Sequence, residues 1–270
     1  RHDETIAPIG TNITHGCVAN VQYINRKFVN MYLCSNGLPI DHTKSADVFK
    51  GYGGLTTEFE NRDNRMKNCL LAHGTKYWDN DKPRIDWKGM DGEDATNAIT
   101  CNVFQGSGYQ NQKWGTERKV ADTFEGYDFP IIRYAEVLLN YAEAMCELGK
   151  FDQTAADKSI NKLRARGHVA KMTVEDITDD FDTARDPSVP ALLWEVRRER
   201  RVELMGEGFR LDDLRRWKKG DYVNKRPLGV YVTGASAKNL KVTGGPSNDE
   251  GYVYFFDAPL GWQEHYYLYP

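Results

Sequence analysis

Apolar residues recur at helical spacing from Pro130 onward. The stripe predicts an amphipathic helix over 131–148 and consists of Ile131, Ala135, Leu138, Ala142 and Met145. Gly149 supplies a left-handed stop, and Asp152 can cap a second helix over 152–166. Because the connection is so short, the two helices must be antiparallel neighbours. We therefore expect a helical hairpin that buries Ile131, Leu138, Ala142, Ile160 and Leu163.

A second pair of helices is predicted after the first. Asp186-Pro187-Ser188 indicates a helix start, because Asp and Ser are capping residues and Pro is tolerated in the first turn. The expected helix covers 189–205, is interrupted by Gly206-Glu207-Gly208, and is followed by a shorter helix over 209–218. Further on, residues 230–232 and 252–256 have the alternation of short strands.

The first 125 residues show little regular pattern. One short helix is expected over 26–34, directly before the turn signal Ser35-Asn36-Gly37-Leu38-Pro39. Either this region is loop-rich, which in a compact domain is usually functional, or it contains short strands that the pattern does not reveal. The sequence thus predicts a mainly α fold with helical hairpins, a large loop-rich region and a few short strands.

The first hairpin has the size of a tetratricopeptide repeat. Its about 36 residues are close to the ~34-residue period of that repeat. Tyr141, Ala142, Gly149, Phe151 and Ala155 stand where the repeat places an aromatic ring, small residues and the turn. A single copy is equally consistent with an ordinary helical hairpin.

Composition excludes several classes of protein. The 36 Lys and Arg against 39 Asp and Glu give a net charge of -3, which argues against a nucleic-acid binder. None of the five cysteines has zinc-site spacing, and the six histidines are scattered, so we expect no metal site and no cofactor. Cys69 and Cys101 could form a disulfide, which the sequence does not decide. No apolar run is long enough to span a membrane.

Four glutamates stand four residues apart, hence along one helical strip, at Glu195, Glu199, Glu203 and Glu207. A glycosidase needs two carboxyls that face each other across a substrate bond, whereas carboxylates at this spacing project side by side. Neighbouring arginines such as Arg198 and Arg201 favour ion pairs on and beside the helix. We therefore expect this glutamate strip to be structural and the protein not to be an enzyme.

An aromatic and polar stretch is the best candidate for ligand binding. Between residues 77 and 114, large rings alternate with Asp, Asn, Gln and Arg side chains. Flat rings match the C–H face of a sugar, and the polar groups match its hydroxyl rim. The candidate ligand-binding residues are Tyr77, Trp78, Trp87, Tyr109 and Trp114. For any single ring, a role as a buried anchor of the loop is the alternative.

Two long motifs stand out in the predicted helices. They are the run Arg133-Tyr134-Ala135-Glu136-Val137-Leu138-Leu139-Asn140-Tyr141-Ala142-Glu143-Ala144, and the run from Glu199-Arg200-Arg201 through Gly208-Phe209-Arg210 to Arg215-Arg216-Trp217. Both motifs resemble the SusD/RagB family of Bacteroidota surface lipoproteins. A weaker match is Arg62-Asp63-Asn64-Arg65, where the family usually has Pro in place of Asn64. At the end of the chain, Trp262 and Tyr266-Tyr267-Leu268-Tyr269-Pro270 resemble the start of the family's closing segment.

The resemblance covers about residues 25 to 270 and only the C-terminal portion of the family pattern. We accordingly expect residues 1–270 to be the C-terminal portion of a single SusD-like domain. Residues 1–125 would form its loop-rich ligand side, 126–219 its helical hairpins, and 220–270 short strands and a C-terminal loop. Both ends look cut, so we expect a fragment or processed chain whose export signal and lipidated cysteine lie elsewhere. Cys17 lacks the apolar run that precedes such a cysteine.

The family resemblance also implies a function. It implies a lipid-anchored protein on the outer face of the outer membrane, paired with a SusC-like TonB-dependent transporter. There it would capture an oligosaccharide, or in some branches a peptide, without catalysis. The alternative from another class is a tetratricopeptide-type scaffold that binds a peptide or protein and no sugar. A glycoside hydrolase is a third reading, which the geometry of the glutamate strip disfavours.

Overall fold

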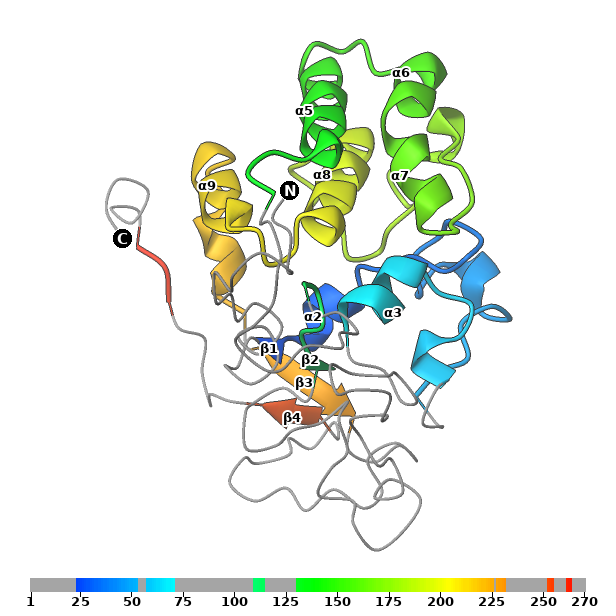
Figure 1. Cartoon of the computed structure of the whole chain (residues 1–270), viewed down its shortest axis with the longest axis vertical. Helices are drawn as coiled ribbons and strands as arrows, with labels where there is room; N and C mark the ends of the chain where they lie inside the picture. The colour runs from blue at the N-terminus through cyan, green and yellow to red at the C-terminus, as the bar shows by residue number, and fades with distance from the viewer. Residues whose placement is uncertain are drawn as a thin grey trace, which may run out of the picture.

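The computed structural model of the chain describes residues 23–52, 57–70, 109–114, 130–225, 227–231, 252–254 and 261–263. The described part is mainly helical, with two short pairs of strands. Helices α5 to α9 lie together, while α2, α3 and the strands lie to one side of them (Figure 1). The fold is therefore the predicted combination of a helical region with a region of short elements.

The first helical hairpin is present. Helix α5 covers Tyr134–Glu147 and runs antiparallel to α6, Gln153–Lys158, and α7, Ile160–Arg166 (Figure 1). Gly149 has the expected left-handed φ of 66°, and the Asp152 carboxylate caps α6 by accepting from the Ala155 amide over 2.8 Å. The predicted turn chemistry is confirmed.

Four of the five residues predicted to be buried in this hairpin are buried. Leu138, Ala142, Ile160 and Leu163 belong to the core, but Ile131 is 89% exposed. The prediction was wrong for Ile131 because α5 begins only at Tyr134, so Ile131 precedes the helix and does not share its inward face.

The second half of the hairpin is two helices and not one. Ser159 has φ −128° and ψ −89°, which interrupts the helix between α6 and α7. Its hydroxyl is buried and donates to the Ala155 carbonyl oxygen over 2.6 Å. Serine competes with helical hydrogen bonding in this way, and a period of apolar residues alone does not reveal the break.

Helix α8, Ala191–Glu203, packs against α5 along the centre of the helical region (Figure 1). Val196 on α8 and Leu139 and Ala142 on α5 are fully buried in the shared core. Helix α8 starts later than the sequence predicts. Asp186 makes a local turn with Ser188 instead of capping the helix, and Pro190 occupies the N-cap.

Helix α9, Phe209–Arg216, follows a turn in which Gly206 and Gly208 both have positive φ. Beyond it, β3, Leu228–Tyr231, pairs antiparallel with β4, Tyr252–Tyr254. Strand β4 falls within the predicted stretch 252–256, whereas β3 overlaps the predicted stretch 230–232 and begins two residues before it. The buried Gly220 leaves space for Trp262, whose nearest ring atom would lie 1.8 Å from a Cβ at that position.

The first region contains short elements held by buried polar groups. Helix α2, Arg26–Val29, is shorter than predicted, and α3, Asn64–Cys69, was not predicted. Strand β1, Tyr23–Ile24, pairs antiparallel with β2, Tyr109–Gln110. The buried Arg62 guanidinium donates to the carbonyl oxygens of Val29 and Tyr32 over 3.0 and 2.8 Å, which ties α2 to the start of α3.

Candidate functional site

Residues 109–114 are the described part of the aromatic stretch, and the backbone holds them from two sides. Strand β2 pairs with β1, and Asn111 forms a bridge with Leu70. The amide of Gln112 donates to the Cys69 carbonyl oxygen over 2.7 Å. The segment is therefore fixed against the end of α3.

Tyr109 lies inside the protein. Its ring is 1% exposed, and its hydroxyl donates to the Glu58 carboxylate over 2.6 Å. The Arg26 guanidinium lies 5.1 Å from the centre of the Tyr109 ring and pairs with the same carboxylate over 3.1 Å. Burial raises the pKa of Tyr109 well above its ordinary value. This environment matches the alternative of a buried anchor for this residue.

Trp114 occupies a different position. Its side chain is half-buried, and the Lys113 ammonium lies 5.6 Å from its ring centre. Its φ of 72° is in the left-handed region, where a bulky side chain is uncommon and costs about 1–2 kcal/mol. Tyr77, Trp78 and Trp87 lie outside the described residues. The role of the five candidates in ligand binding stays a prediction.

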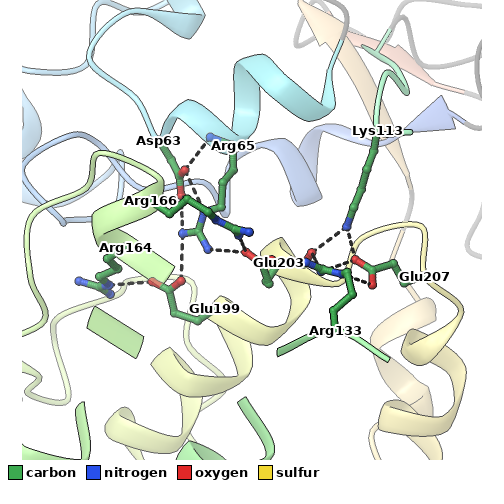
Figure 2. Close-up of polar contacts among 9 residues, drawn as sticks. All are labelled: Asp63, Arg65, Lys113, Arg133, Arg164, Arg166, Glu199, Glu203 and Glu207. Atoms are coloured by element: carbon green, nitrogen blue, oxygen red, sulfur yellow. Dashed lines mark hydrogen bonds and ion pairs between the residues drawn. The ribbon is translucent and has the colours of Figure 1, made fainter. Parts of the chain in front are cut away.

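The first three glutamates of the strip lie buried on α8, and all four belong to a network of ion pairs that reaches other elements. Figure 2 shows most of this network, which joins the strip to α3, α7, the start of α5 and the aromatic segment. Glu199 accepts from Arg164 over 2.7 Å and from Arg65 over 3.0 Å. Glu203 accepts from Arg65, Arg133 and Arg166.

The ends of the strip are also paired. Glu195 accepts from Arg198 over 3.0 Å within α8. Glu207 lies beyond the end of α8 and accepts from Arg133 over 2.5 Å and from Lys113 (Figure 2). The Lys113 ammonium also donates to the Glu203 carbonyl oxygen over 2.7 Å. Lys113, the residue before Trp114, therefore bonds directly to the end of α8 and to the turn that follows it.

Burial and positively charged neighbours shift the pKa values of these carboxyl groups in opposite directions. At Glu199, burial would raise the pKa, but Arg65 and Arg164 outweigh it and lower the pKa. The same balance, with Arg65 and Arg166, lowers the pKa of Glu203. At Glu195 burial prevails over Arg198 and raises the pKa.

The network determines what these carboxylates can do. Each of the four is held by at least one guanidinium or ammonium group from the same chain. Buried charges are tolerated when they are paired and hydrogen-bonded in this way. Among the described residues, no group of three or more His, Cys, Asp or Glu side chains could hold a metal ion. We call the four glutamates and their Arg and Lys partners the internal brace, because their ion pairs hold separate elements of the fold together.

The partners of the strip were only partly foreseeable. The sequence indicated ion pairs with arginines on and beside the same helix, and of these only Arg198 with Glu195 is found among the described residues. The main partners are Arg65, Arg133, Arg164 and Arg166, which come from distant positions. The signal that could have found one of them is Arg62-Asp63-Asn64-Arg65, where Asp63 caps α3 and orients Arg65 over 2.6 Å.

Solved structures with a similar fold are SusD-like proteins. One is a SusD-like carbohydrate binding protein from Bacteroides fragilis, with a TM-score of 0.56 and 21% identity, over 87% of this chain and 43% of that chain. Another is a SusD-like protein from Bacteroides fragilis, with a TM-score of 0.54 and 21% identity, over 90% of this chain and 42% of that chain. The chain therefore spans less than half the length of these structures.

The fold of the chain is thus SusD-like. The model of the SusD family matches residues 2–266, and the chain belongs to this family. No curated protein matches the chain by sequence. In the part of the chain that the structure describes, no helix is both long and apolar enough to cross a membrane.

Proposed function

We propose that this protein is a non-catalytic binder of nutrient oligosaccharide at the cell surface, and that it passes its ligand to a TonB-dependent outer-membrane transporter. The observation that carries the proposal is the match to the SusD family over 2–266, together with a fold shared with a SusD-like carbohydrate binding protein. A lipid-anchored location on the outer face of the outer membrane and a SusC-like partner belong to the same proposal.

The aromatic stretch is the proposed contact with sugar. Among its described members, Trp114 is the better candidate because it is half-buried and its backbone is strained, which is a frequent property of functional positions. The hydrogen bond from the Tyr109 hydroxyl to the Glu58 carboxylate holds the segment 109–114 in place. Tyr77, Trp78 and Trp87 complete the proposed platform.

The internal brace supports the absence of catalysis. A general acid must release a proton to the substrate, and a general base must accept one. The carboxylates of Glu199 and Glu203 are instead buried and occupied by arginines, which holds their pKa low. They are therefore available for neither role.

Two measurements on the full-length protein test the proposal. Calorimetric titration with a panel of neutral oligosaccharides should give saturable binding, and chromatography of the same mixtures should recover the sugars uncut. Affinity purification from the outer membrane should recover a transporter barrel. Binding of a peptide or protein with no affinity for any sugar would favour the scaffold alternative instead.

A further inference from the structure

A cavity of about 590 Å³ lies between α2, α8, α9 and the segment after Asp182. This volume is within the range of small-molecule sites. Neither Tyr109 nor Trp114 lines the cavity, although Arg26, whose guanidinium lies 5.1 Å from the centre of the Tyr109 ring, does. Its walls include three aromatic rings, those of Trp194, Trp217 and Tyr222.

Positive charge prevails on the wall. Eight Arg and Lys side chains and four Asp side chains line the cavity. Several of the arginines are neutralised nearby, as with Arg198, which pairs with Asp182. Asp186 is likewise occupied by Lys219 and by the Tyr222 hydroxyl, both over 2.7 Å.

Lys27, Arg201, Arg210 and Lys225 also line the wall, and none of the four forms an ion pair among the described residues. Asp213 acts on Arg210 from a distance, but its carboxylate is held by Arg200 and Arg216. The four cations come from α2, α8, α9 and the segment before β3, and they lie close enough to repel one another. Burial, together with Arg210 and Arg198, lowers the pKa of Arg201. Gathering like charges in a partly buried cavity is unfavourable, and an anion that enters the cavity relieves the repulsion.

Aromatic rings lie next to three of these cations. The Arg210 guanidinium lies 5.7 Å from the centre of the Trp217 ring, and the Lys27 ammonium lies 5.9 Å from that of Tyr222. The Arg201 guanidinium lies 5.5 Å from the Phe28 ring. Guanidinium groups bind carboxylate and sulfate oxygens in pairs, and aromatic faces suit the apolar face of a sugar ring.

We propose that this cavity binds an anionic ligand, and specifically a sugar that carries a carboxylate or a sulfate ester. Arg201, Arg210 and Lys27 hold the anionic group, and Trp194 and Tyr222 line the space for the ring. The choice of a sugar rests on the proposed function, whereas the preference for an anion rests only on the charges of the wall.

Calorimetric titration of the full-length protein with glucuronate, glucose and inorganic sulfate tests this site. We expect glucuronate to bind and glucose to show at least tenfold weaker binding, with sulfate competing for the site. Arg210→Gln should weaken glucuronate binding at least tenfold. Arg215→Gln is the matched control, since it removes the same charge from the same helix but does not line the cavity, and it should leave the affinity unchanged.

A second variant keeps the test valid if Arg210→Gln fails to fold. Lys27 is exposed on α2, so Lys27→Gln should fold normally and weaken glucuronate binding several-fold, with Lys67→Gln on α3 as its control. Partial burial and the charges of Lys225, Arg201 and Arg210 lower the pKa of Lys27 to about 8. Binding at pH 8 should therefore take up a proton, and Lys27→Gln should abolish that uptake.

The outcomes separate this site from the general function. Absence of glucuronate binding, or binding that Arg210→Gln and Lys27→Gln leave intact, would overturn the site even if neutral oligosaccharides bind. Binding of sulfate alone would contradict the assignment to a sugar. A protein that binds glucuronate in this cavity but no neutral oligosaccharide would support the site and contradict the aromatic platform.

Discussion

The Arg65 guanidinium donates to the Glu199 carboxylate over 3.0 Å, although the two residues are 134 positions apart. Arg65 belongs to α3 in the region of short elements, and Glu199 belongs to α8 in the helical region. Both side chains are almost fully buried. This pair therefore fastens the two parts of the fold to each other, and the same network reaches the segment that contains Trp114.

Removing one charge from this network should be costly. Glu199→Gln leaves Arg65 and Arg164 without their shared carboxylate, and the loss of one partner of a buried pair typically costs about 3–5 kcal/mol. We expect a reduction of that size in the free energy of unfolding, measured by urea denaturation, and no loss of any hydrolytic activity. Asp212→Asn, which affects an exposed pair with Arg215, should change stability by less than about 1 kcal/mol.

Glu195→Gln should cost less than Glu199→Gln, although both residues lie buried on the same helix. Burial raises the pKa of Glu195, whereas its arginine partners lower the pKa of Glu199. The charged form is therefore less favoured at Glu195 than at Glu199. Glu195 also lies 3.7 Å from the Arg164 guanidinium. An equal or greater loss of stability in Glu195→Gln would show that its pairs with Arg198 and Arg164 are stronger than the raised pKa indicates.

Low pH should weaken the ion pairs of the internal brace. The pKa values of Glu199 and Glu203 are lowered in the folded protein below the ordinary value of 4.5. Their stabilising contribution is complete above that value and is lost as the pH falls through the folded values. Melting temperatures measured from pH 7 to pH 3 should fall steeply below about pH 4.5. A melting temperature that stays constant over this range would contradict the prediction.

Tyr109 and Trp114 should respond differently to substitution. Tyr109→Phe removes a buried hydrogen bond to Glu58 and should cost about 1–3 kcal/mol of stability, with sugar affinity per folded molecule unchanged. Trp114→Ala should weaken oligosaccharide binding at least tenfold, or about 1.4 kcal/mol. Calorimetry and thermal melting separate the two effects. If alanine at all five candidate positions leaves affinity intact, the binding site lies elsewhere.

Two isoleucines give a direct test of the hairpin. Ile160 is fully buried, and Ile160→Ala should cost about 2–5 kcal/mol. Ile131 is 89% exposed, and Ile131→Ala should change the free energy of unfolding by less than about 0.5 kcal/mol. Equal losses for the two substitutions would mean that Ile131 is covered in the folded protein.

The helical region could be predicted from sequence because its signals are local. A period of apolar residues, Gly149 and the Asp152 cap specify α5 and the start of α6 without reference to distant residues. The break at Ser159 could not be predicted, because it depends on how a hydroxyl competes for one carbonyl group. Helix α3 was missed because six residues are too few for a period to show.

The site was less predictable than the fold. The glutamate strip is plain in the sequence, but its partners Arg65, Arg133 and Arg164 are brought to it only by the tertiary structure. Tyr109 and Trp114 look alike in the sequence as rings among polar residues. The two residues differ in burial. Tyr109 is buried through contacts with β1 and Glu58, which are distant from it in the chain.

Whether this protein binds oligosaccharide without cleaving it can be decided by titration of the full-length protein with oligosaccharides, followed by analysis of the recovered sugars. We expect saturable binding of at least one oligosaccharide, with the sugar recovered at its original length after prolonged incubation. Shortened sugars produced at an enzymatic rate, or no binding across a broad panel, would contradict it.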